Sequence, residues 1–515
     1  MSTVHQLIAA ISPDRRAISA VTDDNNPSKP AMTFAALAEL MTSTISQLNS
    51  IGIGRGDRVA IVLPNGAEMA AAFLAVAAGA SAAPLNPAYR ADEFDFYMSD
   101  LGAKAVIVMA EDDTPAVKVA NDRGIPVLVL TPADVAGQFS LDVSAASAAD
   151  AALPGASQPE DEALVLHTSG TTSRPKVVPL SNANVTASAL NISTTLSLPP
   201  DDRGLNIMPM FHIHGLIASL LSSMAAGAEV MFTPGFNALK IFQWFDEAKP
   251  SWYTAVPTMH QAIVSRAKRN ADILDQMKLR FIRSSSSSLP VPVMEDVEAT
   301  FGCAVIEAYG MTEAAHQMAS NPLPPKTRKP GSVGIAAGPD ICIMSAEGEV
   351  QPTNGIGEIC IRGGNVFSGY ENNPDANAEA FHGDWFRTGD QGYLDDEGYL
   401  RISGRLKEII NRGGEKISPR EVDDVLQAHP AVAQIVTFAL PHPKLGEEVA
   451  AVIVLEDGAV ATEAELKEFA SAKLADFKVP RVIKFIDEIP KGATGKLQRI
   501  GLAEKLGLAE QQDIA

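Results

Sequence analysis

The sequence has few cysteines and no long apolar run, and both shortages restrict what the protein can be. Its three cysteines are Cys303, Cys342 and Cys360. An odd number of cysteines without metal-type spacing predicts reduced thiols rather than a disulfide framework or a zinc site. No stretch approaches the roughly 18 uninterrupted apolar residues of a transmembrane helix, so we expect no membrane insertion. Residues 69–83 are apolar but shorter, and we expect a buried helix there.

Positively charged residues are scarce relative to acidic ones. The chain carries 41 Lys and Arg against 62 Asp and Glu, which gives a formal net charge of −21. Because nucleic acids and anionic membranes are bound through basic surfaces, this balance argues against both as the main partner. The first residues lack the pattern of a signal peptide, and the last are not a Ser-Lys-Leu peroxisomal signal. We therefore expect a cytoplasmic location.

The first part of the chain alternates strand-like and helix-like segments. Residues 59–63 are a short apolar run stopped by Pro-Asn-Gly, and similar runs recur at 105–109 and 126–130. Residues 34–48 and 67–80 carry apolar residues at helical spacing. This alternation predicts an α/β fold in which helices cover parallel sheets. The length of 515 residues predicts about two to four structural units.

The pattern changes in the second half of the chain. Residues 332–402 contain short alternating runs separated by turns, which is typical of a small antiparallel β subdomain. The remaining sequence mixes helix starts with strand-like runs and predicts a small α+β domain. We therefore expect a large N-terminal domain of residues 1–403 that includes the β subdomain, followed by a C-terminal domain of residues 404–515.

A hydroxyl-rich loop at residues 168–176 is the first candidate site. It follows the apolar run 163–166, which we interpret as a buried strand. Backbone N–H groups and hydroxyls that leave a strand edge can hold a polyphosphate while a cation offsets its charge. An ordinary Ser/Thr turn has a similar composition, and the loop alone does not decide between these interpretations. The candidate residues are Thr168, Ser169, Gly170, Thr171, Thr172 and Lys176.

Polar residues also follow two later predicted strands. Residues 283–288, an arginine and five serines, come after the apparent strand 279–282, and we expect a tight loop near a ligand rather than a flexible linker. Residues 304–309 lead into a loop that contains Glu313. A carboxylate beside a triphosphate is a suitable magnesium ligand, because Mg²⁺ prefers hard oxygen donors. A solvated glutamate is the alternative.

Four further residues have two interpretations each. His212 and His214 would share one side of a strand, but no Cys/His cluster completes a zinc site, and we expect a core or pocket role for both. Asp390 stands beside a glycine, where it can bridge two ribose hydroxyls or simply occupy a turn. Lys496 lies in a glycine-flanked segment, which by itself is typical of a solvated surface lysine.

Together these segments resemble the adenylate-forming enzymes, a superfamily of acyl-CoA synthetases, luciferase-like enzymes and adenylation domains. The resemblance covers nearly the whole chain and rests on five motifs in the family's order. They are residues 168–176, 309–313, 387–390, 404–408 and 495–496. The chain departs from the first motif because two usual glycines are Ser173 and Val177, which restricts the backbone of the loop.

The resemblance implies a ligation in two steps. A carboxylate and Mg-ATP would give an acyl-adenylate and pyrophosphate, and coenzyme A would then displace AMP. Catalytic roles are implied for Lys496, for Glu313 as the magnesium ligand and for His212 at the acyl site. The implied ATP and AMP contacts are Thr168, Ser169, Gly170, Thr171, Thr172, Lys176, Tyr309, Gly310, Thr312, Asp390 and Arg405.

The resemblance also implies that the C-terminal domain is mobile. Lys407 occupies the hinge position of the family, and the small domain would rotate about it between the two half-reactions. Rotation would withdraw Lys496 from the acyl-adenylate. It would bring Gly413 and Gly414 toward coenzyme A.

Within the superfamily, four segments resemble the oxalate:CoA ligases: residues 211–216, 252–258, 311–316 and 411–419. A small dianion needs hydrogen bonds and positive charge at its second carboxylate, because burying an unpaired charge is costly. His214, Ser286 and His316 can supply these groups, although either histidine could instead be a core residue. We expect a ligase for oxalate. The alternatives are malonate or another short dicarboxylate, an aryl or medium-chain acid, or a non-catalytic nucleotide-binding protein.

Overall fold

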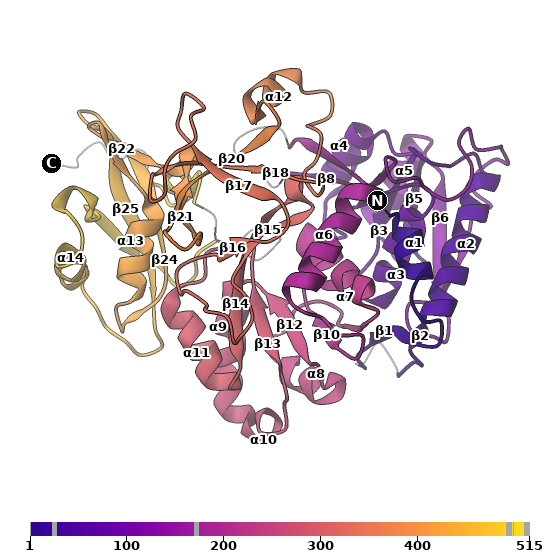
Figure 1. Cartoon of the computed structure of the whole chain (residues 1–515), viewed down its shortest axis with the longest axis horizontal. Helices are drawn as coiled ribbons and strands as arrows, with labels where there is room; N and C mark the ends of the chain where they lie inside the picture. The colour runs from indigo at the N-terminus through magenta and orange to yellow at the C-terminus, as the bar shows by residue number, and fades with distance from the viewer. Residues whose placement is uncertain (1, 23–27, 169–174, 491–496, 498, 509–515) are drawn as a thin grey trace.

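The computed structural model describes residues 2–22, 28–168, 175–490, 497 and 499–508. Five predicted site residues lie outside the described residues: Ser169, Gly170, Thr171, Thr172 and Lys496. Figure 1 shows the early part of the chain, in indigo and purple, on one side of the molecule and the last part, in yellow, on the other. Among the described helices, none has the length and apolar character needed to cross a membrane.

The first large sheet has seven strands, of which the five central ones run parallel. The edge strands β7 and β9 pair antiparallel to their neighbours. In sheet order the strands are β7 (Phe139–Asp142), β6 (Val127–Pro132), β5 (Ala105–Met109), β3 (Arg58–Val62), β4 (Ser81–Pro84), β8 (Glu162–His167) and β9 (Val177–Ser181). The helices in this part are α2 (Phe34–Ser50), α3 (Ala67–Ala77), α4 (Ala91–Leu101) and α5 (Pro115–Asp122).

The second large sheet has nine strands, and six of them form a parallel centre. In order they are β16 (Ile335–Ala336), β15 (His316–Ser320), β14 (Ala304–Met311), β13 (Phe281–Ser284), β12 (Trp252–Ala255), β10 (Arg203–Asn206), β11 (Glu229–Phe232), β1 (Arg16–Ala20) and β2 (Met32–Thr33). Its helical segments are α1 (Val4–Ala9), α6 (Asn182–Thr195), η1 (His214–Leu221), α7 (Ser222–Ala226), α8 (Ile241–Ala248), α9 (Pro257–Ala267), η2 (Lys268–Asn270), α10 (Ala271–Leu274), α11 (Val291–Phe301) and η3 (Thr312–Ala314). The two large sheets confirm the expected α/β fold with parallel strands.

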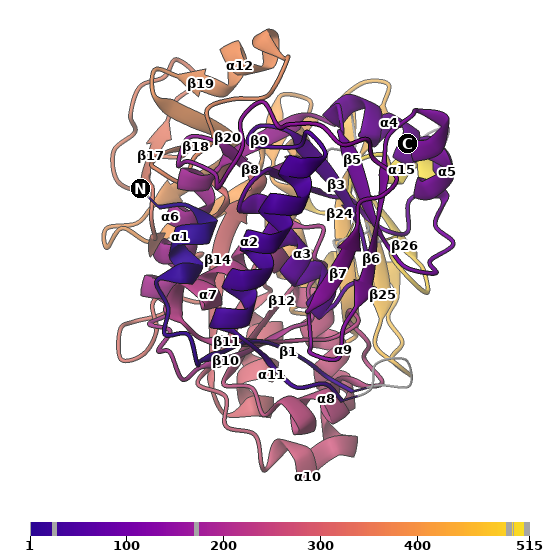
Figure 2. The same cartoon turned by 90° about the vertical axis from the view of Figure 1, so that its right-hand side faces the viewer.

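Helix α3 lies between the two large sheets. Every residue of α3 except Glu68 is buried, which confirms the expected buried helix as far as Ala77. Residues 81–83 of the expected range belong to strand β4 instead. The helix contacts β3, β4 and β8 of the first sheet, and β1 of the second. Figure 2 shows α1 and α2 on the side of the molecule that faces the viewer. The apolar residues of α3 belong to the same core as α1 and α2.

A smaller antiparallel sheet follows in the chain. It consists of β17 (Asp340–Met344), β18 (Gly357–Arg362), β20 (Trp385–Leu394), β19 (Phe381–His382) and β21 (Leu400–Arg405), with α12 (Pro374–Ala380) beside it. The pairing of these strands agrees with the expected antiparallel β subdomain. Its boundaries at residues 332 and 402, and the division of the chain near residue 403, stay predictions.

The last part of the chain is a small α+β unit, as expected. A sheet of β23 (Glu415–Ile417), β22 (Ile410–Arg412), β25 (Gly446–Leu455), β24 (Val432–His442) and β26 (Val482–Phe485) has apolar clusters of its own. Helix α13 begins at Pro419 after Ser418, whose hydroxyl accepts the N–H of Glu421. The other helical segments are η4 (Leu406–Glu408), α13 (Pro419–Gln427), α14 (Glu463–Ser471), η5 (Asp476–Lys478) and α15 (Leu502–Lys505).

Candidate active site

Strands β8 and β9 hold the two ends of the hydroxyl-rich loop together. The N–H of Thr168 donates to the carbonyl of Lys176 at 2.9 Å, and the N–H of Lys176 donates to Thr168 Oγ1 at 3.0 Å. Just before the loop, His167 Nε2 lies 3.0 Å from Asp100 Oδ2 of α4. The loop therefore begins and ends at a strand edge, as predicted. The phosphate contacts of residues 169–172 stay predictions, because those residues are not described.

Lys176, Tyr370 and Glu313 lie together beside this loop. Lys176 Nζ is 4.0 Å from the centre of the Tyr370 ring, a distance at which a cation is attracted to an aromatic face. Tyr370 Oη donates to Glu313 Oε1 at 2.8 Å. Burial lowers the pKa of Lys176, and the Glu313 carboxylate opposes this shift. Burial and then the charge of Glu313 raise the pKa of Tyr370, so the phenol keeps its proton and remains a donor.

Glu313 fits the role of a magnesium ligand that was predicted for it. The residue is buried on η3, and its carbonyl accepts the N–H of Phe367 at 2.8 Å. No group of three or more His, Cys, Asp or Glu side chains in the described part of the chain could hold a metal by itself. Mg²⁺ commonly binds through one or two carboxylates and completes its shell with phosphate oxygens and water. A single carboxylate beside a phosphate loop therefore suits a metal that arrives with a polyphosphate.

Tyr309, Asp390 and Arg405 form a second cluster. Tyr309 Oη donates to Asp390 Oδ2, and Arg405 Nε donates to Asp390 Oδ1 at 3.0 Å. The antiparallel register of β20 and β21 places Asp390 directly opposite Arg405. Burial, followed by the charge of Asp390, raises the pKa of Tyr309 well above its ordinary value. Asp390 in turn raises the pKa of Arg405. The structure thus brings together three residues predicted to contact one nucleotide.

His214 is the centre of a third, buried cluster. Its Nδ1 lies 3.0 Å from Ser286 Oγ, and its Nε2 lies 2.6 Å from Thr254 Oγ1. The ring of His316 is 5.0 Å from the ring of His214, measured between ring centres. His214 and His316 have exposed fractions of 0% and 1%. All three predicted acyl-site residues therefore lie at one place, with Thr254 as an additional member.

The backbone around this third cluster is unusual. Ser286 and His316 have φ angles of 72° and 99°, in the left-handed region that non-glycine residues rarely adopt. A Cβ added to Gly310 would lie 2.0 Å from the carbonyl oxygen of His316, so only glycine permits this approach. Backbone strain of this kind concentrates at functional sites, where the surrounding structure holds it in place.

The expectation that His212 and His214 share one side of a strand is wrong. His214 begins the π-helix η1, and His212 lies in the preceding turn. A Cβ added to Gly215 would lie 2.4 Å from the carbonyl oxygen of Pro209, so the chain folds back on itself too tightly for a strand. The N–H of His214 donates to His212 Nδ1 at 3.3 Å. His214 is fully buried, whereas His212 is only partly buried.

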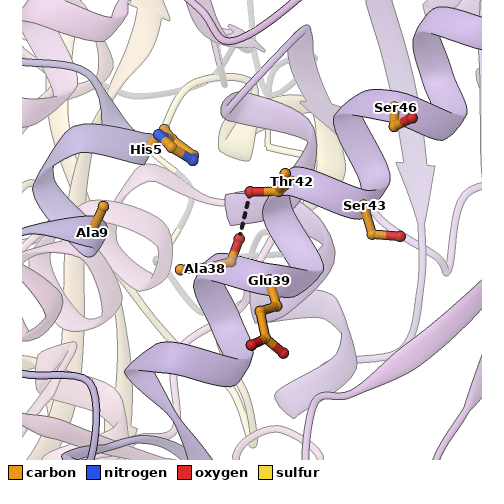
Figure 3. Close-up of a pocket in the computed structure, with 7 residues that line it drawn as sticks. All are labelled: His5, Ala9, Ala38, Glu39, Thr42, Ser43 and Ser46. Atoms are coloured by element: carbon orange, nitrogen blue, oxygen red, sulfur yellow. Dashed lines mark hydrogen bonds between the residues drawn. The ribbon is translucent and has the colours of Figure 1, made fainter.

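His212 lines a small hollow of about 50 Å³ between the large sheets. The hollow is also lined by His167, which precedes the phosphate loop, and by Thr312 of the Glu313 motif. His212 thus lies near both the start of the hydroxyl-rich loop and the Glu313 motif. Its implied role at the acyl site stays a prediction. A separate hollow of about 600 Å³ lies between α1 and α2 at the surface, and none of the predicted site residues lines it (Figure 3).

The predicted hinge and coenzyme A residues lie in the last part of the chain. Lys407 is the central residue of η4, and its charge contributes to lowering the pKa of Lys176. Gly413 and Gly414 form the turn between β22 and β23, with φ angles of 60° and 101°. Their roles as hinge and coenzyme A contacts stay predictions.

Sequence reasoning missed two residues of these clusters, Tyr370 and Thr254. Thr254 belongs to the segment 252–258, one of the four that resemble the oxalate:CoA ligases, so its place in that segment was an available signal. Tyr370 follows Ser-Gly in a stretch without a recognised motif. Tyr370 and Glu313 are far apart in the chain and meet only in the folded structure, so the local sequence around Tyr370 does not predict their hydrogen bond.

The chain is similar to known proteins over nearly its whole length. Residues 7–371 match the family described as AMP-binding enzyme, and residues 421–496 match the AMP-binding enzyme C-terminal domain. An oxalate–CoA ligase of Arabidopsis thaliana is 45% identical over 505 residues, which cover 97% of each chain. An oxalate–CoA ligase of Saccharomyces cerevisiae is 42% identical over 477 residues, or 87% of each chain. The solved structure of ATP-bound MatB from Rhodopseudomonas palustris has a TM-score of 0.86 and 30% identity, covering 98% of this chain and 99% of that one.

Proposed function

The chain belongs to the family of AMP-binding enzymes, and we propose that within this family it ligates oxalate to coenzyme A. Whatever its acid, the enzyme is an acyl-CoA ligase, which activates a carboxylic acid as its acyl-adenylate. AMP and pyrophosphate would be the other products of the two steps. The observation that carries the choice of acid is the buried cluster of His214, Ser286 and His316.

The His214 cluster suits a small dianion better than an apolar acid. A buried carboxylate is costly unless hydrogen bonds or charges offset it, and an apolar acyl chain gains nothing from polar walls. The two ring nitrogens of His214 face the hydroxyls of Ser286 and Thr254. Because each hydroxyl can donate or accept, His214 can change its protonation state and still keep both partners. The cluster can therefore present a proton to an incoming carboxylate.

The Lys176–Tyr370–Glu313 cluster suits the triphosphate of ATP. Transfer at a phosphate depends mainly on positioning and on charge stabilisation, which a lysine and a metal-binding carboxylate supply. Bound Mg²⁺ would neutralise phosphate oxygens at this place. Tyr370 donates to one oxygen of Glu313 and so fixes the orientation of the carboxylate. In the same enzyme, Asp390 and Arg405 would hold the ribose, and Tyr309 would lie against the adenine.

The roles of the C-terminal residues follow from the family. Lys496 would contact the carboxylate and the α-phosphate during adenylation. Rotation about Lys407 would then bring Gly413 and Gly414 toward coenzyme A for thioester formation. Arg499, close to Lys496 in sequence, donates to Glu408 Oε2 at 3.0 Å and to Asp423 Oδ2 at 2.8 Å. Arg499 therefore ties this end of the chain to the residue after the hinge.

The test is pyrophosphate release across a panel of acids in the presence of ATP, Mg²⁺ and coenzyme A. The panel contains oxalate, malonate, acetate, cinnamate and octanoate. We expect oxalate to give the highest kcat/KM. Turnover of cinnamate or octanoate without turnover of oxalate would overturn the proposal, and no turnover of any acid would favour a non-catalytic nucleotide-binding protein.

A further inference from the structure

Arg283 is a fully buried arginine near the proposed acyl cluster. Its exposed fraction is 0%, and it is among the largest fully buried side chains. Arg283 Nη2 donates to Gln317 Oε1 at 3.3 Å. Within the described residues, its Nε and Nη1 have no hydrogen-bond partner although both atoms are buried. Arg283 opens the polar run 283–288, and the structure places it within β13 rather than in a loop. Neither the five family motifs nor the proposed function gives it a role.

A buried guanidinium without an acidic partner needs an explanation. Arginine is almost never fully buried unless it is paired, because an isolated buried charge is costly. Burial lowers the pKa of Arg283 to about 9, and no other group contributes to this shift. The side chain is thus cationic at neutral pH, and no carboxylate of the described residues offsets it.

The nearest acidic residue on the neighbouring strand faces away from Arg283. Arg283 pairs with Ile306 of β14, whereas Glu307 pairs with Ser284. Successive residues of a strand project to opposite faces, so the Glu307 side chain lies on the other face of the sheet. A pairing within the sheet therefore does not compensate the charge of Arg283.

The register of the sheet places Arg283 next to the acyl cluster. Arg283 is the parallel partner of Thr254, and partners in adjacent strands project to the same face. Thr254 Oγ1 in turn lies 2.6 Å from His214 Nε2. On the other side, the amide of Gln317 that accepts from Arg283 belongs to the residue after His316. Figure 1 shows β12, β13 and β14 side by side at this place.

We propose that Arg283 is a specificity-determining residue that offsets the second carboxylate of a dicarboxylate substrate. The inference rests on the proposed function and extends it to a residue outside the His214 cluster. Arg283 is fully buried, neighbours Thr254 in the sheet and donates to Gln317, so in this proposal it acts through its electric field rather than by direct contact with the substrate. In a buried, low-dielectric site such a field is weakly screened by water and salt. A dianion would be compensated there, whereas a monocarboxylate of the same size would leave the cation unbalanced.

The experiment compares oxalate with glyoxylate, a monocarboxylate of similar size, in the full-length enzyme. Arg283→Gln should lower kcat/KM for oxalate by about 100-fold, a loss expected when one partner of a buried charge pair is removed. The KM for ATP should stay unchanged, and the ratio of kcat/KM for oxalate over glyoxylate should fall by a similar factor. Equal losses with both acids would indicate a merely structural role and overturn the inference.

Arg280→Gln is the matched control. Arg280 lies three residues earlier and pairs with Asp202, outside the acyl cluster. This variant should keep the preference for oxalate over glyoxylate. If Arg280→Gln also lost that preference, the effect would not be specific to Arg283.

Arg283→Lys keeps a buried cation and is the test variant to use if Arg283→Gln does not fold. It should retain the preference for oxalate within about tenfold, because charge rather than hydrogen bonding carries the effect; a lysine variant without the preference would contradict the inference.

The wild-type enzyme separates a failure of this inference from a failure of the proposed function. If the wild type activates no short dicarboxylate, the proposed function is wrong and the inference falls with it. If the wild type prefers oxalate and Arg283→Gln keeps that preference, only the inference is wrong. A wild type that prefers oxalate together with a glutamine variant that does not would support both.

Discussion

Tyr370 donates its phenolic hydrogen bond to Glu313 at 2.8 Å while its ring faces the ammonium group of Lys176 at 4.0 Å. One aromatic residue thus orients the proposed metal-binding carboxylate and supports the cation beside it. The two functions use different parts of the side chain, the hydroxyl and the ring. They can therefore be separated by substitution.

Tyr370→Phe keeps the ring and removes the hydrogen bond to Glu313. We expect the Mg²⁺ concentration for half-maximal adenylation to rise about tenfold or more, because a hydrogen bond to a charged group contributes about 1.5–3 kcal/mol. A magnesium titration of pyrophosphate release measures this change. Tyr399→Phe is the control, since it removes a hydroxyl that donates to Thr327 at 2.6 Å, away from the site. An unchanged magnesium requirement in Tyr370→Phe would contradict the proposed role of Glu313.

His214→Ala removes the central residue of the acyl cluster. The variant should raise the KM for oxalate about 10- to 100-fold and the KM for ATP much less, because it takes away hydrogen bonds that a charged substrate would use. Steady-state kinetics with each substrate varied in turn gives both values. His260→Ala is a comparison variant, because His260 is a buried histidine near Tyr253 rather than in this cluster. A larger effect on ATP than on oxalate would move His214 out of the acyl pocket.

Lys496→Ala should separate the two half-reactions. We expect adenylation to slow about 100- to 1,000-fold, the range seen when a group that stabilises developing charge is removed. Thioester formation from preformed acyl-adenylate should change within about fivefold, because the lysine would act only in the first step. Single-turnover assays of each step provide the measurement. Equal losses in both steps would refute this division of roles.

Glu307 should make stability depend on pH. Burial raises the pKa of Glu307 from 4.5 to about 7, partly opposed by the charge of Arg420. The folded state therefore holds this proton more tightly than the unfolded state. The stability that it contributes is complete below pH 4.5 and is lost as the pH rises through 7.

The variant that tests this is Glu307→Gln, which is neutral at every pH and keeps an oxygen that can accept from the N–H of Leu289. Relative to wild type, it should gain up to about 3 kcal/mol at pH 8 and little at pH 4.5. Thermal unfolding at both pH values measures the difference. Glu295→Gln, at an exposed position of α11, is the control. A gain of equal size at both pH values would show that titration of Glu307 is not the cause.

Motifs at the ends of strands were the part of the site that the sequence could predict. Lys176 and Glu313 were identified because each lies in a polar segment next to an apolar strand, and strand ends in an α/β fold meet at a sheet edge. Asp390 was identified by the glycine beside it, and the structure places it within β20 rather than in a turn. The alternation of apolar runs also predicted the parallel sheets. Local patterns were sufficient for both, because each element is specified by residues close together in the chain.

Contacts between distant elements could not be predicted in the same way. Tyr370 reaches Glu313 from a loop, and Arg283 neighbours Thr254 only because of the register of β12 and β13. The strand expected at His212 and His214 failed for a related reason. The close approach of Gly215 to Pro209 forces a turn, and a two-residue spacing carries no information about such an approach.

Helix α3 has a consequence for the geometry of the whole site. The helix touches both β8, which leads into the hydroxyl-rich loop, and η1, which begins with His214. Six of its 11 residues are alanines, and the small side chains let the two layers approach closely. The spacing between the end of β8 and His214, the proposed phosphate and acyl sites, is thus set by the thickness of a packed helix. Helix α3 therefore acts as a spacer between the two layers. A larger side chain in place of one of its alanines would move the proposed phosphate and acyl sites apart without contacting either of them.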